Sequence, residues 1–126
     1  MDSSAEIAVA DILGPEGSIA RRLDHYELRP QQLEMADAVA AAILHKRHLC
    51  VEAGTGVGKS FAYLVPAILF AVSRKKKAVI CTHTINLQEQ LVEKDLPVLK
   101  QVLPVEFSFT MLKGRQNYLC TRRLQK

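Results

Sequence analysis

The sequence predicts an α/β fold in which helices cover a parallel sheet. Helix and strand patterns alternate along the chain with short connections, an order typical of layered folds with parallel strands. A glycine-rich segment also joins an apolar strand pattern, His48–Ala53, to an apolar helix pattern, Lys59–Val72. Because dense glycine is costly in backbone entropy, that segment must need unusual backbone freedom. The 126 residues have the length of one domain.

The clearest helix pattern runs from Pro30 to Lys46. Proline in the first turn costs no hydrogen bond, because the first N–H groups of a helix have no partner inside it. Residues 1–29 show no comparable pattern and are expected to be a lead-in segment with a turn or loop at Gly14–Ser18. The apolar residues of the helix recur at helical spacing and form one stripe: Leu33, Ala36, Val39, Ala40, Ile43 and Leu44.

The glycine-rich segment has the spacing of a phosphate-binding loop between a strand and a helix. Backbone N–H groups in such a loop converge on an anion, and the helix N-terminus adds partial positive charge. Lys59 is expected to reach the β- and γ-phosphates and Ser60 to ligate Mg²⁺, so these two residues are the catalytic candidates. Ala53 stands where the motif has its first glycine. The predicted loop consists of Ala53, Gly54, Thr55, Gly56, Val57, Gly58, Lys59 and Ser60.

Three further elements are expected in the second half of the chain. They are a buried strand at Lys76–His83, an amphipathic helix at Asn86–Leu103 that bends or breaks before Pro97, and a strand at Val105–Leu112. Ligand-binding loops of open α/β sheets follow the carboxyl ends of strands. Short polar side chains at that place suit contacts with a nucleic-acid backbone. The candidates are Thr82, His83, Thr84 and Asn86.

Charge is distributed unevenly between the two halves of the chain. Residues 1–52 carry five basic and nine acidic side chains, whereas residues 53–126 carry twelve basic and four acidic ones. The basic half is expected to bind a polyanion such as DNA, the alternative being a solvated basic face. No membrane span or secretory signal is expected, and the three cysteines indicate a cytoplasmic setting without disulfides. Cys50 and Cys81 are expected to be packed within buried strands.

Four segments, in order, resemble the DinG-like, XPD-like DNA helicases of superfamily 2. "RPQQ" is similar to the family's Q motif, with Arg29 and Gln32 implied in ATP binding and Gln31 as the alternative adenine contact. "AGTGVGKS" is similar to motif I, and "CTHTINLQEQL" to motif Ia, which contacts single-stranded DNA. "LKGRQNYLC" is similar to the stretch that supplies the first cysteine of a 4Fe–4S cluster, here Cys120.

This resemblance implies a bacterial enzyme that binds ATP and Mg²⁺ and unwinds duplex DNA in the 5′-to-3′ direction. It also implies a partial RecA-like phosphate-loop domain at residues 30–112, and the start of a cluster domain at 113–126. After Ser60 the chain has no Asp-Glu pair at the end of an apolar strand, so it is expected to stop before the Walker B strand. Two alternatives stay open: a stand-alone nucleotide- or DNA-binding module without hydrolysis, and an unrelated phosphate-loop enzyme such as a small kinase.

Overall fold

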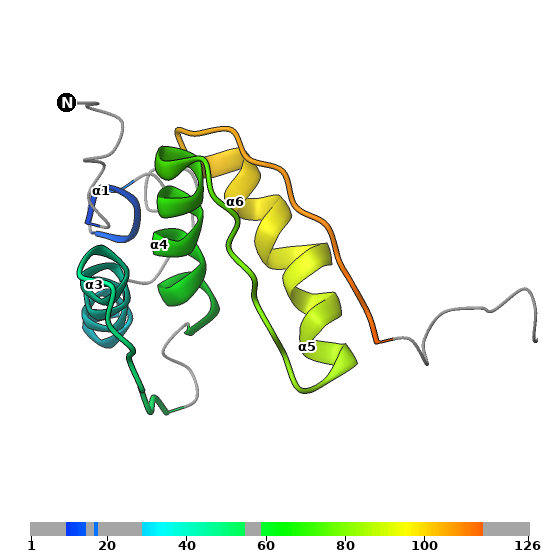
Figure 1. The fold of residues 1–126 in the computed structure, drawn as a ribbon, viewed down its shortest axis with the longest axis horizontal. Helices are drawn as coiled ribbons and strands as arrows, with labels where there is room; N and C mark the ends of the chain where they lie inside the picture. The colour runs from blue at the N-terminus through cyan, green and yellow to red at the C-terminus, as the bar shows by residue number, and fades with distance from the viewer. Residues whose placement is uncertain (1–9, 15–16, 18–28, 55–58, 115–126) are drawn as a thin grey trace, which may run out of the picture.

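The computed structural model describes residues 10–14, 17, 29–54 and 59–114 (Figure 1). Its helices are α1 (Ala10–Leu13), α3 (Pro30–Leu44), α4 (Lys59–Arg74), α5 (Ile85–Gln90) and α6 (Leu96–Val102). A π-helical turn, η2 (Leu91–Asp95), joins α5 to α6. In this part of the chain no helix has the length and apolarity needed to cross a membrane.

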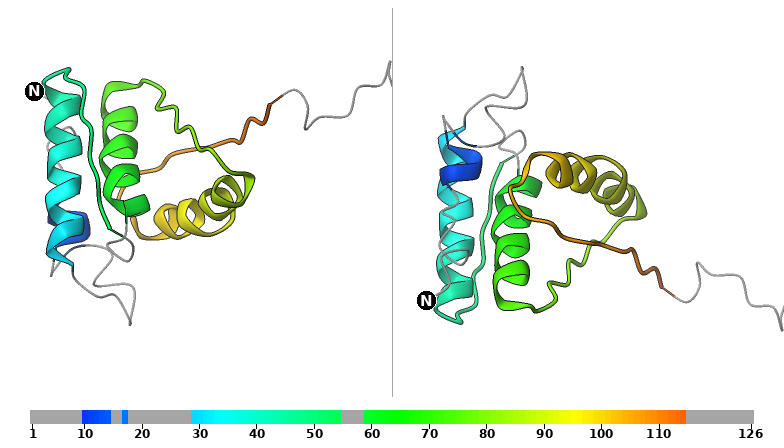
Figure 2. Two further views of the ribbon diagram at one scale, coloured as in Figure 1. Left: turned by 90° about the horizontal axis from the view of Figure 1, so that it is seen from below. Right: turned by 90° about the horizontal axis from the view of Figure 1, so that it is seen from above.

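Helices α3 and α4 form the central pair of the fold. They pack directly along each other, and the segment 47–54 runs back alongside the pair (Figure 2). Both predicted helices are confirmed, although α3 ends two residues before the expected Lys46 and α4 continues two residues past the expected Val72. The predicted stripe of α3 is only partly buried: Ala36 is in the core, but Leu44 at the helix end is 62% exposed.

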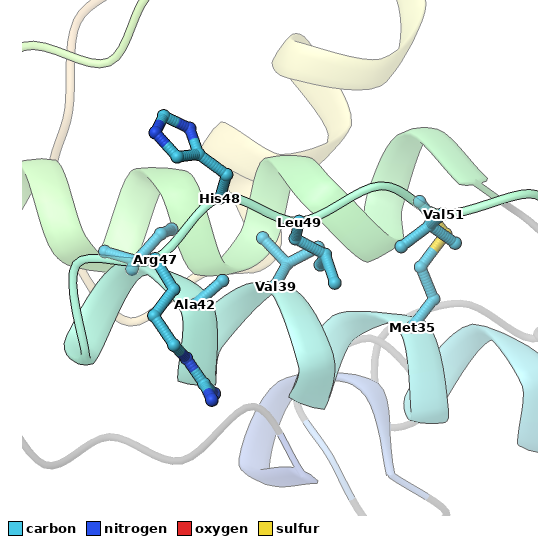
Figure 3. Close-up of a pocket in the computed structure, with 8 residues that line it drawn as sticks. Met35, Val39, Ala42, Arg47, His48, Leu49 and Val51 are labelled. Atoms are coloured by element: carbon cyan, nitrogen blue, oxygen red, sulfur yellow. The ribbon is translucent and has the colours of Figure 1, made fainter.

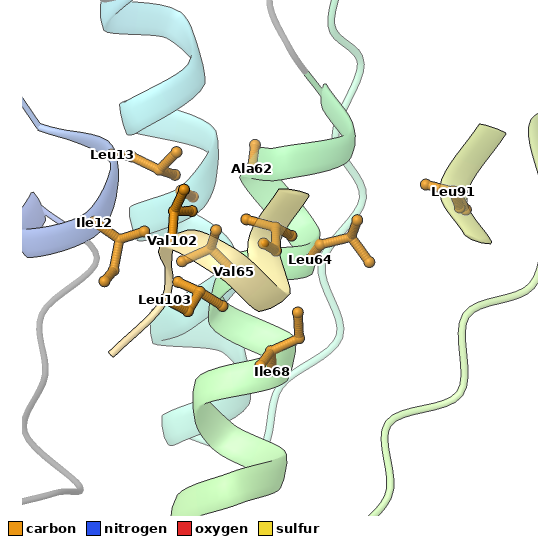
Figure 4. Close-up of a cluster of buried hydrophobic side chains, with 11 residues drawn as sticks. Ile12, Leu13, Ala62, Leu64, Val65, Ile68, Leu91, Val102 and Leu103 are labelled. Atoms are coloured by element: carbon orange, nitrogen blue, oxygen red, sulfur yellow. The ribbon is translucent and has the colours of Figure 1, made fainter. Parts of the chain in front are cut away.

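One apolar core joins α1, α3, α4 and α6 (Figure 4). Its largest fully buried side chains include Ile12 and Leu13 from α1, at positions where the sequence showed only a loosely patterned lead-in. The short helix α1 therefore belongs to the packed fold, because burying two branched aliphatic side chains contributes several kcal/mol, at about 1.5–3 kcal/mol each. Beyond it, the expected turn is present, with the Gly17 N–H bonded to the Gly14 carbonyl at 3.0 Å.

The helix predicted at Asn86–Leu103 is continuous but irregular, as its proline required. Pro97 lies in the first turn of α6, directly after the π-helical turn η2. A proline within a helix has no N–H to donate, and its ring crowds the carbonyl four residues before it. A widened turn at Leu91–Asp95 relieves that crowding and still lets Leu91, Leu99 and Val102 face the core.

The expected parallel sheet is not formed among the described residues, which contain no strand. The segments 48–53 and 76–83 are almost wholly exposed, and Cys50 and Cys81 are exposed free thiols. The prediction that these cysteines pack inside buried strands is therefore wrong for this structure. A strand pairs through backbone hydrogen bonds with a neighbour alongside it, and among the described residues neither 76–83 nor 105–112 has such a ladder.

The third expected strand, Val105–Leu112, is not part of a sheet, but its side chains alternate between half-buried and exposed as they do in a strand. Every odd-numbered residue from 105 to 113 is half-buried, and every even-numbered residue from 106 to 114 is exposed. Phe107 and Phe109 share the half-buried side with ring centroids 6.2 Å apart, and the Lys100 ammonium of α6 lies 5.8 Å from the Phe109 ring centroid. Side-chain contacts with α6 thus hold this segment extended.

Two lysines end the central helices in a left-handed conformation. Lys46 after α3 has φ 55° and Lys75 after α4 has φ 53°. In each case the next N–H turns back to a helix carbonyl, Arg47 to Ala42 at 2.8 Å and Lys76 to Ala71 at 3.0 Å. This is the Schellman arrangement, in which glycine is the preferred residue at the left-handed position.

Replacing Lys75 with glycine is therefore expected to stabilise the protein. Glycine adopts positive φ without the steric cost that a side chain pays, so the free energy of unfolding should rise by about 0.5–1 kcal/mol. Urea unfolding followed by circular dichroism measures the change. Lys77→Gly is the control, because it removes the same side chain where φ is not positive, and it should give no gain in stability. Equal changes in the two variants would show that the left-handed conformation of Lys75 is not the cause of the stabilisation.

Candidate nucleotide-binding site

The first residue of α4 carries the cation expected to meet a phosphate. Lys59 is exposed, and its Nζ donates a hydrogen bond to the Ala53 carbonyl at 3.1 Å, which places the ammonium at the start of the predicted loop. The first turn of α4 holds no acidic residue, so nothing within that turn opposes the positive end of the helix dipole. Thr55, Gly56, Val57 and Gly58 lie outside the described residues. At Gly54, an added Cβ would meet no atom within 4 Å, so the steric need for glycine does not arise there.

Ser60, the predicted magnesium ligand, belongs to a polar cluster that links α4 to η2. Its side chain lies close to the Tyr63 hydroxyl one turn further along α4 and to the Asp95 carboxylate at the end of η2, near enough to act on the pKa of both groups. Gln90 lies close to Asp95 as well. Asp95 Oδ2 is buried without a hydrogen-bond partner. Sequence reasoning placed Asp95 on a helix and gave it no role.

Burial governs the acidity of both ionisable groups in this cluster. Desolvation raises the pKa of the Asp95 carboxyl, although the hydrogen bonds from Gln90 and Ser60 and the charge of Lys94 lower it. Desolvation likewise raises the pKa of the Tyr63 hydroxyl, with the nearby Asp95 charge acting in the same direction and the Ser60 hydrogen bond opposing it. Tyr63 therefore stays neutral at pH 7 and can donate its proton to a neighbouring oxygen.

The predicted adenine-contacting segment forms the start of α3. Arg29 is the half-buried N-cap residue, and its carbonyl accepts the N–H groups of Gln32 at 3.0 Å and Leu33 at 3.3 Å. The side chain of Gln32 is only 4% exposed, whereas that of Gln31 is exposed. An adenine base can reach an exposed amide without rearrangement of the protein. The exposure of the two side chains therefore favours Gln31 as the adenine contact.

Two of the four predicted DNA-contacting residues have structural hydrogen bonds. Thr84 is the N-cap of α5, its hydroxyl oxygen accepting the Leu87 N–H at 3.2 Å, and the Thr82 hydroxyl donates to the Thr84 carbonyl at 3.2 Å. These bonds fix the loop before α5. The side chains of His83 in that loop and of Asn86 in the first turn of α5 are exposed.

The segment that precedes the predicted cluster cysteine is hydrogen-bonded to α5. Gln88 of α5 donates from Nε2 to the Leu112 carbonyl at 3.1 Å. Cys120 itself lies outside the described residues. Within the parts of the chain that the structure describes, no group of three or more His, Cys, Asp or Glu side chains could hold a metal ion.

An apolar groove of about 490 Å³ separates α3 from the segment that follows it. Figure 3 shows Val39 beside Leu49 and Met35 beside Val51, so the groove lies along the side of α3. Neither the predicted adenine contacts nor Lys59 and Ser60 line it. The groove is therefore separate from the candidate nucleotide site.

A lysine and a hydroxyl at the start of a helix, beside a glycine-rich loop, are typical of nucleotide-binding proteins. Residues 32–124 match the DEAD/DEAH box helicase family, and the chain belongs to that family. Family membership implies a RecA-like phosphate-loop fold, and the resemblance found from the sequence motifs is confirmed.

Similar proteins come from several bacteria. The chain is 45% identical over 121 residues to the "ATP-dependent DNA helicase YoaA" of Haemophilus influenzae, an alignment covering 96% of this chain and 18% of that protein. It is 51% identical over 100 residues to the "ATP-dependent helicase DinG" of Mycobacterium tuberculosis, an alignment covering 76% of this chain and 15% of that protein. It is 36% identical over 113 residues to the "3'-5' exonuclease DinG" of Bacillus subtilis, covering 90% and 12%. The chain thus spans less than one-fifth of the length of these relatives.

Proposed function

We propose that this chain is the N-terminal part of an ATP-dependent DNA helicase and carries its ATP-binding motifs. The observation that supports this most directly is the position of Lys59 at the start of α4, with its ammonium 3.1 Å from the carbonyl of Ala53 at the loop's first residue. An ammonium held there by one exposed hydrogen bond is free to turn toward a bound phosphate. The names of the relatives, ATP-dependent helicases, support ATP as the ligand.

The residues present fit a nucleotide bound with magnesium. Lys59 would contact the phosphates, the N–H groups of the loop and of the first turn of α4 would bind their oxygens, and Ser60 would hold Mg²⁺. Mg²⁺, when bound, neutralises charge on the β- and γ-phosphates. The half-buried hydroxyl of Ser60, already part of a hydrogen-bonded cluster, is a suitable donor for a hard cation.

The three segments without strand pairing are proposed to pair in a parallel RecA-like sheet within the longer protein. Val79 and Leu112 are each 82% exposed here, which is unusual for apolar residues in sequences of strand character. Neighbouring strands would cover these side chains and satisfy the unpaired backbone groups. The Walker B carboxylates, which these 126 residues lack, are proposed to lie in the same longer chain.

We further infer that the loop before α5 and the first turn of α5 contact single-stranded DNA, through the exposed His83 and Asn86 and the backbone of Thr82 and Thr84. The basic second half would add salt-sensitive attraction to phosphates. Cys120 is proposed as a ligand of a 4Fe–4S cluster in the complete protein, which would act in the bacterial cytoplasm.

The full-length protein tests this proposal in one experiment. ATP hydrolysis should rise when single-stranded DNA is added, and a duplex with a 5′ single-stranded tail should be unwound. ATP hydrolysis without unwinding of a duplex that carries either a 5′ or a 3′ single-stranded tail would contradict the helicase assignment. Nucleotide or DNA binding with no hydrolysis in any condition would favour the alternative of a binding module, which is consistent with the small share of the relatives that the chain covers.

Removing the adenine contact is expected to abolish the preference for ATP over GTP. Because Gln31 is exposed and Gln32 is buried, Gln31→Ala should weaken ATP binding by about 1–3 kcal/mol, the scale of one bidentate base contact, and leave GTP binding unchanged. Gln32→Ala should instead lower the stability of the fold. Competition between the two nucleotides for a fluorescent ATP analogue measures the preference, and a loss confined to Gln32→Ala would restore the original assignment to that residue.

A further inference from the structure

Asp95 lies where a distant part of the chain meets the start of the phosphate-loop helix. The π-helical turn η2 packs against α4, and Asp95 is the last residue of that turn. Its carboxylate lies close to Ser60 in the first turn of α4 and to Gln90 at the end of α5. Thirty-five residues of sequence therefore separate two side chains that the fold brings into contact.

The carboxylate of Asp95 is incompletely satisfied at this place. Oδ2 is buried and has no hydrogen-bond partner, whereas each buried polar atom in a folded protein normally has one. A buried carboxylate oxygen without a partner costs free energy, so the position needs a reason beyond packing. An apolar residue would fill the same space without that cost.

The chemistry of a metal-binding hydroxyl supplies the reason. A serine that ligates a cation must direct a lone pair of its oxygen at the metal and its proton elsewhere. A carboxylate that accepts this proton in a hydrogen bond fixes the hydroxyl and makes its oxygen a stronger donor. The Tyr63 hydroxyl also lies close to Ser60.

We propose that Asp95 is a positioning residue for the Mg²⁺–nucleotide site, accepting the hydrogen bond of the Ser60 hydroxyl while that oxygen binds the cation. The inference rests on the proposed function and adds to it a residue outside the loop and outside its helix. A purely structural role for Asp95, linking η2 to α4, predicts altered stability with no change in how magnesium affects nucleotide binding.

The test compares nucleotide binding with and without magnesium in the full-length protein. A fluorescent ATP analogue is titrated in EDTA and at increasing Mg²⁺ concentrations, for the wild type and for Asp95→Ala. The magnesium-dependent gain in affinity should fall by about 10- to 100-fold in the variant, the usual effect of losing an outer-shell partner. Binding in EDTA should not change. Glu93→Ala, which removes an exposed acid of the same turn, is the control and should match the wild type.

Asp95→Asn keeps an acceptor oxygen and should give a magnesium dependence between those of the wild type and the alanine variant. It also carries the test if Asp95→Ala does not fold. Wild-type magnesium dependence in both variants would overturn the inference and leave the proposed function standing. Failure of the wild type itself to bind the nucleotide would overturn the proposed function, and this inference with it.

Discussion

Replacing Lys59 with alanine is expected to lower the rate of ATP hydrolysis by the full-length protein at least about 100-fold, because the variant loses a charge that stabilises the transferred phosphoryl group. The structure adds a reason why the loss should be specific. The ammonium is exposed and makes one hydrogen bond, to Ala53, so its removal should leave the core intact. DNA-stimulated unwinding should be lost together with hydrolysis.

The measurement is the steady-state ATPase rate with and without single-stranded DNA, accompanied by an unfolding curve for each variant. Lys77→Ala is the matched control, since it removes an exposed lysine just after the opposite end of α4. Turnover near the wild-type level in Lys59→Ala would contradict the phosphate-site assignment. A large loss of stability would show that the ammonium has a structural role instead.

The helices could be predicted because their causes are local. Spacing of apolar residues, proline in the first turn of α3 and the break before Pro97 all act over a few residues, and the structure agrees within two residues at the ends of α3 and α4. The short helix α1 could not be found this way, because four residues carry too little periodicity. Its place is set by burial of Ile12 and Leu13 against distant helices.

The strands show the limit of the same reasoning. Apolar runs such as Ala78–Cys81 indicate a buried strand, yet burial requires neighbours that local sequence does not specify. In this structure those residues stay exposed. The Val105–Leu112 segment differs because Lys100 and the phenyl rings hold one of its sides against α6, so its alternation is visible without a sheet.

Within the candidate site, the motif located Lys59 and Ser60 but not their surroundings. Asp95 approaches Ser60 only because the α5–η2–α6 helix folds back onto α4, and no spacing in the sequence encodes that contact. The hydrogen-bonding role of Thr84 could have been predicted from the sequence. A threonine directly before a helix pattern is a typical N-cap, and that signal could have been used.

Replacing Leu99 with alanine should cause a large loss of stability, as expected for a fully buried core residue. Its side chain is 0% exposed and packs in the cluster that joins α6 to α4 and α1. Truncating a buried leucine removes transfer free energy and leaves a cavity, so the free energy of unfolding should fall by about 2–5 kcal/mol.

Leu44→Ala is the matched control for this substitution, because the same atoms are removed from a side chain that is 62% exposed. It should change the free energy of unfolding by no more than about 0.5 kcal/mol, since little apolar area is lost and alanine favours helix. Urea unfolding of both variants provides the comparison. Equal losses would mean that α6 does not pack on α4 as the structure has it. In that case the contact between Asp95 and Ser60, which depends on the same packing, would fail as well.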